Sequence, residues 1–227
     1  MLKKLSLAVA VASATLSGLA YAETVETPVG KLDVTMTATL ATDWLNRGRT
    51  LNGAPTVQGS FDVAHESGAY AGIWGGSMGA GGGSEFDYYV GYGSSLTEEF
   101  SFDVNLATYT YPKTGWDDDL ELSVSVSGYN ATLGAKRRFK ADTEKQNYIF
   151  VGYDVELPAG FGLSLNVGHT DMDDDAAADY VDYGVAISKT IAGVNAQLAY
   201  ASTDLDKDEC NAYSCENNVV FSLSKTF

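Results

Sequence analysis

Apolar and polar residues alternate along most of the chain, and this repeat of two residues limits what the chain can fold into. The clearest runs cover residues 33–40, 100–106, 119–126 and 161–168. Successive side chains of a β-strand point to opposite faces, whereas a helix repeats about every 3.6 residues. The sequence therefore predicts an all-β protein whose strands each carry one apolar and one polar face.

The alternation predicts twelve strands, with ten or fourteen as alternatives. Most have about the 9–11 residues that a tilted strand needs to cross a bilayer. The predicted strands are residues 32–45, 57–66, 69–77, 85–93, 100–111, 119–128, 130–139, 147–157, 161–170, 180–189, 193–203 and 217–227.

Short and long connections alternate strictly between these strands. The short connections are residues 67–68, 94–99, 128–130, 158–160 and 190–192, and the longer polar ones are residues 46–56, 78–84, 112–118, 140–146, 171–179 and 204–216. Bacterial outer-membrane barrels combine short periplasmic turns with longer extracellular loops in this way. We therefore predict a transmembrane antiparallel up-and-down β-barrel of about 12 strands, with both ends in the periplasm.

The first 22 residues have the pattern of a secretory signal peptide. Lys3 and Lys4 give a positive start, residues 5–20 are apolar or small, and Ala20 and Ala22 form a small-x-small cleavage site. We expect residues 1–22 to be removed after export and residues 23–227 to form a barrel domain in the cell outer membrane. No other stretch has the ~20 apolar residues of a membrane helix.

The last strand ends on an aromatic residue, Phe227, which lies in phase with Val219 and Phe221. A barrel in lipid must pair its last strand with its first, because an open edge leaves backbone groups unsatisfied. A final strand ending on Phe resembles the terminal signal of bacterial outer-membrane proteins. We therefore expect the outer-membrane assembly machinery to recognise Phe227. Lys225 departs from the aromatic or apolar residue that is usual two places earlier.

Acidic residues outnumber basic residues by 30 to 14, which gives a net charge of −16. Nucleic-acid binding is not expected, since a duplex requires a basic surface. The 24 Gly, 14 Tyr and moderate hydrophobicity suit strands that face a polar lumen on one side. Cys210 and Cys215 predict a disulfide in an exported chain, because neither His is close enough in sequence to complete a metal site with the two thiols.

Several strings in the first half of the chain resemble the TorF family of bacterial porins, also known as the conserved hypothetical family Gcw_chp. The strings are residues 42–48 (TDWLNRG), 55–62, 65–74, 85–92 and 109–112. They keep the family's order, and the resemblance extends over the mature chain, although the second half matches only as alternating strands and acidic loops. The resemblance implies an outer-membrane barrel with a channel role, and it brings no defined substrate, cofactor or catalytic residue.

The phase of the strands predicts which polar side chains enter the lumen. Arg47 and Arg49 follow the first predicted strand, so we expect them to fold into the mouth of the barrel. The predicted lumen lining is Asp43, Arg47, Arg49, Gln58, Asp62, Glu85, Asp87, Asp103 and Glu121. Rings of carboxylates favour cations. The lining therefore predicts passive diffusion of small polar or cationic solutes, and a closed structural or surface-interaction barrel is the alternative.

Charged runs mark the long-loop side of the predicted barrel. The basic run at 136–140 could bind the phosphates of lipopolysaccharide, or it could form a solvated rim paired with acids, which we favour. The acidic loops at 117–119, 171–175 and 204–209 could capture divalent cations diffusely, or they could be solvated, which we favour. In the second of these, Ala176 stands where a calcium loop requires Gly. The sequence predicts no metal ion or cofactor; the lipid bilayer and small solutes are the expected partners.

Two other classes of protein, outer-membrane lipases and soluble ligand-binding barrels, would require different sequence features. An outer-membrane lipase needs a Ser–His pair, yet His169 should face lipid while Ser164 is out of phase with it. Ser188 and Ser202 are nearby candidates, His65 lies near a short turn, and no nucleophile elbow is present. We therefore expect no enzyme. A soluble exported ligand-binding barrel would need the reverse phase, with an apolar interior and a polar exterior.

Overall fold

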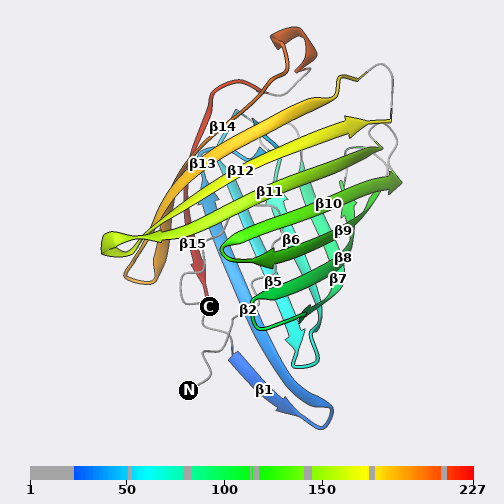
Figure 1. Cartoon of the computed structure of the whole chain (residues 1–227), viewed down its shortest axis with the longest axis vertical. Coiled ribbons are helices and arrows are strands. Elements are labelled where there is room, and N and C mark those ends of the chain that lie inside the picture. The colour runs from blue at the N-terminus through cyan, green and yellow to red at the C-terminus, as the bar shows by residue number, and fades with distance from the viewer. Residues whose placement is uncertain are drawn as a thin grey trace.

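The computed structural model describes residues 23–50, 53–78, 83–112, 114, 118–140, 145–173, 177–210 and 214–227. The predicted signal peptide lies outside the described residues, as do parts of the long loops, among them Asp117, Asp174 and Asp175. The chain forms a closed twelve-stranded antiparallel β-barrel (Figure 1), so the predicted fold class is confirmed.

The barrel strands lie close to the predicted ranges. They are β2 (Gly30–Ala41), β5 (Thr56–His65), β6 (Ala69–Ser77), β7 (Ser84–Ser95), β8 (Phe100–Thr110), β9 (Asp119–Gly128), β10 (Ala131–Lys140), β11 (Gln146–Leu157), β12 (Phe161–Met172), β13 (Tyr180–Ile191), β14 (Val194–Thr203) and β15 (Asn218–Thr226). The remaining elements are β1 (Glu23–Thr27), β3 (Leu45–Asn46), β4 (Arg49–Thr50) and the 3-10 turns η1 (Pro158–Gly160) and η2 (Lys207–Glu209).

Neighbouring strands of the barrel are consecutive in sequence, and β2 closes the ring by pairing with β5 on one edge and with β15 on the other. The connections β5–β6, β7–β8, β9–β10, β11–β12 and β13–β14 are short and gather at one end of the barrel, here called the short-turn end. The other connections are longer and gather at the opposite end, called the long-loop end.

The first strand differs from its predicted range of 32–45, because β2 ends at Ala41 and forms a hairpin with the unpredicted strand β1. β1 pairs with the first residues of β2, and β15 pairs with residues 37–41 on the same edge. Between them, the Phe227 N–H donates to the Met36 carbonyl oxygen at 2.8 Å. Figure 1 shows the β1–β2 hairpin projecting beyond the short turns. β1 escaped prediction because its sequence, ETVET, has no apolar face.

The two faces of the barrel wall have opposite polarity. Large apolar side chains such as Val90, Leu133 and Val167 are more than half exposed on the outside, whereas inward Glu121 is 3% exposed. Lys225 also points outward, with its ammonium group 4.8 Å from the centre of the Phe227 ring. This phase is the opposite of what a soluble ligand-binding barrel requires. Neither helical turn within the described residues is long or apolar enough to cross a membrane.

Candidate functional site

A short hairpin folds into the barrel at the long-loop end. β3 and β4 pair through Leu45–Thr50 and Asn46–Arg49, which leaves Arg47 and Gly48 as a two-residue turn. Both turn residues have positive φ, 47° for Arg47 and 76° for Gly48, as a type I′ hairpin turn requires. We call residues 45–50 the inserted hairpin.

Gly48 brings the turn of the inserted hairpin into close contact with the barrel wall. A Cβ atom at this position would lie 2.6 Å from the Ser202 carbonyl oxygen and 2.8 Å from Asp182 Cβ. The Asn218 side-chain amide donates to the Gly48 carbonyl oxygen at 2.9 Å, and the Thr50 N–H donates to the Ser214 carbonyl oxygen at 2.8 Å. The hairpin is therefore seated against β13, β14 and β15.

From this position Arg47 extends to another part of the wall. Its Nη2 atom donates to Glu121 Oε2 at 2.7 Å, and the two side chains are only 6% and 3% exposed. The Arg47 guanidinium also lies 4.5 Å from the ring centre of Tyr148, and Arg49 lies 4.9 Å from that of Tyr180. Both arginines therefore lie inside the barrel, over aromatic rings that provide cation–π attraction.

Two further basic residues face the lumen, and they come from the run that was expected to form an outer rim. The Arg138 guanidinium lies 3.1 Å from Asp119 Oδ2 and 3.7 Å from Glu121 Oε2, and Lys136 Nζ lies 4.0 Å from Glu121 Oε1. The expected pairing with acids is therefore observed, but the expected solvated position is wrong for Lys136 and Arg138. The reason is the strand period, which sends residues 136 and 138 to one face of β10 and Arg137 to the other. The expected solvated position is also wrong for Asp119 of the first acidic loop, which is 8% exposed.

The predicted acidic residues Glu85 and Asp87 lie beside this cluster. Each is 5% exposed, and the two lie two residues apart on the inward face of β7. Tyr109 links them to the basic residues, because it pairs in register with Asp87 and its hydroxyl donates to Glu121 at 2.9 Å. The Arg138 guanidinium lies 5.2 Å from the centre of the same ring. The long-loop half of the lumen is therefore a mixed-charge zone.

Carboxylates in the short-turn half have different surroundings. Tyr70 donates to Asp103 at 2.8 Å, Tyr89 donates to Asp62, and Ser60 donates to Asp62 at 2.8 Å. Within the described part of the chain, neither carboxylate takes part in a salt bridge. The negative charge of this half is therefore not offset by a nearby basic side chain.

The remaining predicted lumen residues lie at the edges of these zones. Asp43 accepts a hydrogen bond from the N–H of Trp44 at 2.7 Å, just before the inserted hairpin. Trp44 in turn packs against Trp74 of β6, with ring centres 5.4 Å apart. Gln58 is half-buried on β5, opposite Gly76 of β6.

A disulfide joins Cys210 and Cys215, whose Cα atoms lie 5.8 Å apart. Both cysteines are buried in a small apolar cluster with Leu205 and Tyr180. The Arg49 guanidinium lies over the ring of the same Tyr180. Tyr180 therefore contacts both the disulfide loop and the inserted hairpin. No group of three or more acidic, His or Cys residues suited to a metal ion occurs among the described residues.

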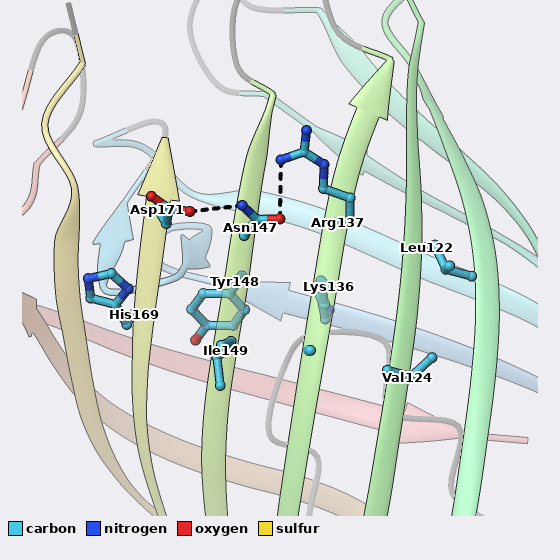
Figure 2. A pocket seen from close by; sticks show the side chains of 10 residues that line it. Leu122, Val124, Lys136, Arg137, Asn147, Tyr148, Ile149, His169 and Asp171 are labelled. Carbon is cyan, nitrogen blue, oxygen red and sulfur yellow. Dashed lines mark hydrogen bonds between the residues drawn. The ribbon is translucent and has the colours of Figure 1, made fainter. Parts of the chain in front are cut away.

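The outer wall near the long-loop end carries a groove of about 480 Å³. Figure 2 shows its polar end, where Arg137 donates to Asn147 at 3.1 Å and Asn147 donates to Asp171 at 2.8 Å. Arg137 also donates two hydrogen bonds to Asp173, and these hold the pKa of the Asp173 carboxyl below its usual range. His169 lines the same groove.

The serine and histidine residues considered for hydrolysis lie on opposite sides of the wall. His169 faces outward, whereas Ser164, Ser188 and Ser202 are each 4% exposed on the inward face. His65 hydrogen-bonds to the Val29 carbonyl oxygen at the short-turn end. None of these serines therefore contacts a histidine across the wall.

The family model described as a bacterial protein of unknown function (Gcw_chp) matches residues 25–227. No curated protein matches the chain. Among solved structures, the NanC porin has a TM-score of 0.57 at 8% identity, over 84% of this chain and 98% of that chain. The KdgM porin has a TM-score of 0.56 at 5% identity, over 85% of this chain and 98% of that chain. At such low identity, the likeness concerns the barrel fold.

Proposed function

The chain belongs to the Gcw_chp family of bacterial proteins of unknown function, and we propose that it forms a porin-like channel of the outer membrane for passive diffusion of small polar or cationic solutes. The observation that carries this proposal is the polarity of the closed wall. An apolar exterior suits contact with lipid, and an interior lined by Asp62, Asp103, Arg47 and Glu121 suits contact with hydrated solutes.

Export and membrane insertion complete the proposal. Residues 1–22 act as a cleaved signal peptide, and the outer-membrane assembly machinery recognises the strand that ends in Phe227. Lys225 fits an outward position near the membrane surface, since its ammonium group can reach the headgroups while its alkyl chain covers the Phe227 ring. Contact with lipopolysaccharide would fall to Arg137 at the polar end of the outer groove rather than to Lys136 or Arg138.

The preference for cations rests on the short-turn half of the lumen. In the mixed-charge zone, Arg47, Lys136 and Arg138 offset much of the negative charge of the carboxylates. Asp62 and Asp103 have no such compensation, so their charges produce a negative potential along the path of a solute.

The second candidate is a closed barrel that serves structure or surface interaction without transport. The burial of Arg47 and Glu121 favours it, because the inserted hairpin leaves these side chains almost no contact with solvent. A barrel of twelve strands also lies between the filled eight-stranded class and the open class of about 16 strands.

Planar bilayers containing the purified, refolded protein distinguish the two candidates. A channel gives discrete current steps in KCl, and a reversal potential in a salt gradient that shows preference for K⁺ over Cl⁻. A closed barrel gives no steps at any applied voltage. Discrete steps with preference for Cl⁻ would support a channel and contradict the role assigned to Asp62 and Asp103.

A further inference from the structure

One buried ion pair joins the inserted hairpin to the opposite part of the lumen wall. Arg47 comes from the turn between β3 and β4, and Glu121 comes from β9. Their 2.7 Å contact lies inside the barrel and is shielded from solvent. In a channel, a solute that passes this level passes close to both side chains and can separate them.

Unpartnered polar atoms lie around this pair. Among the described residues, Arg47 Nη1 and Arg138 Nε are buried donors without a hydrogen-bond partner, and Asp87 Oδ1 is a buried acceptor without one. Tyr109 brings these groups together, since it pairs in register with Asp87, carries Arg138 over its ring and donates to Glu121. Guanidinium donors bind a carboxylate well, and carboxylate oxygens bind an ammonium group well.

The free-energy cost of separating Arg47 from Glu121 depends on the charge of the solute that comes near them. A cation can pair with Glu121, but it leaves the Arg47 guanidinium buried without its partner. An anion can pair with Arg47, but it leaves Glu121 with only its longer contacts to Lys136 and Arg138, at 4.0 and 3.7 Å. A neutral solute compensates neither charge of the separated pair. Removing one partner from a buried ion pair is strongly unfavourable. A solute with both an ammonium and a carboxylate group can replace both partners at once.

We propose that the mixed-charge zone selects zwitterionic solutes of amino-acid size. The solute carboxylate pairs with Arg47 and Arg138, and the solute ammonium pairs with Glu121 and Asp87. The nearly complete burial of these side chains limits the solute to a small one. This inference rests on the proposed channel function. Within that function, the inserted hairpin determines which small solutes pass most readily.

Swelling of proteoliposomes in isosmotic alanine and lactamide tests the inference. The two solutes have nearly the same size and shape, and only alanine is zwitterionic. We expect alanine to enter about threefold faster than lactamide or more, because only alanine compensates both charges of the opened pair. Equal rates, or faster entry of lactamide, would overturn the inference while leaving the channel intact. Entry of neither solute would overturn the channel proposal and this inference with it.

A double variant locates the preference. R47Q/E121Q keeps a polar side chain at each position and removes both charges, so the ratio of alanine to lactamide entry should fall to about one. The matched control is R137Q/D173N, which removes an ion pair from the outer wall and should leave the ratio unchanged. An alanine preference that survives in R47Q/E121Q would overturn the assignment to this pair.

A second readout uses only the wild-type protein. Alanine added to a planar bilayer should reduce the single-channel KCl current, because it occupies the mixed-charge zone on its way through. With lactamide at the same concentration, the single-channel KCl current should be higher than it is with alanine. Equal currents in the two solutes would contradict the inference even if the double variant did not fold.

Discussion

Arg47 and Glu121, which are 74 residues apart in the sequence, form an ion pair inside the barrel with a distance of 2.7 Å between Arg47 Nη2 and Glu121 Oε2. The pair connects a hairpin that is not part of the barrel wall to β9, which is. It therefore adds a link across the lumen to the contacts that seat the inserted hairpin on β13, β14 and β15, and the charge of the lumen at this level depends on it.

Removing Glu121 should destabilise the barrel strongly. Arg47, Lys136 and Arg138 all lie within 4.0 Å of its carboxylate, and E121A would leave these buried cations with too little compensation. A loss of about 3–5 kcal/mol of unfolding free energy is expected, as for other broken buried pairs. Urea unfolding of the protein in lipid vesicles measures it. The exposed pair of Arg137 and Asp173 provides the control, since D173A should leave the unfolding curve nearly unchanged. Equal effects of the two variants would argue against a buried Glu121.

Adding a side chain at Gly48 should displace the inserted hairpin. A Cβ atom there meets the Ser202 carbonyl oxygen at 2.6 Å, so G48A cannot seat the turn against the wall. We expect a larger single-channel conductance than that of the wild type, because the hairpin no longer narrows the lumen. G193A is the matched control: Gly193 has φ of 78°, close to the 76° of Gly48, but nothing lies within 4 Å of its added Cβ. An unchanged conductance in G48A would show that the inserted hairpin does not determine the width of the lumen.

Neutralising the two carboxylates of the short-turn half should reduce cation preference. Asp62 and Asp103 lack salt-bridge partners in the described chain, so D62N/D103N removes uncompensated negative charge from the lumen. The reversal potential in a KCl gradient should shift toward zero, while single-channel current steps persist. D173N removes one acidic charge from outside the lumen and should not shift the potential. A reversal potential that D62N/D103N does not change would place the selectivity elsewhere.

The disulfide between Cys210 and Cys215 should support the long-loop end more than the barrel as a whole. C210S/C215S removes the constraint of a short loop, for which a loss of about 2 kcal/mol is expected. The cysteines pack against Tyr180, and the Arg49 guanidinium of the inserted hairpin lies over the Tyr180 ring. Loss of the disulfide should therefore loosen the hairpin, and the single-channel current should fluctuate more. Thiol labelling of the unreduced native protein checks the premise, and labelled cysteines would contradict it.

The barrel and the direction of its side chains follow from local sequence. Period-two alternation and loop length were enough to predict twelve strands and the inward position of Asp87 and Glu121, because both features are properties of single strands and their connections. The same rule also places Lys136 and Arg138 inside. Their adjacency to Arg137 and Lys140 nevertheless suggested a surface patch, and the strand phase would have divided the run correctly.

The inserted hairpin could be predicted only in part. The sequence placed Arg47 and Arg49 near the mouth, and the Asn46–Gly48 stretch has the residues of a tight turn. The position of the turn is set by contacts with Asn218, Ser214 and Ser202, all far away in sequence. Such contacts form only when the barrel closes, so the local sequence pattern cannot predict them.

Modification of a cysteine at position 47 tests most directly whether solutes pass the inserted hairpin. R47C is treated with a bulky thiol-reactive methanethiosulfonate reagent during a planar-bilayer recording, with the native disulfide left intact; R137C on the outer wall is the control. If the path lies through the lumen beside the hairpin, the reagent reduces the current through R47C and leaves the current through R137C unchanged. A current through R47C that the reagent does not alter would contradict a channel at this level of the barrel.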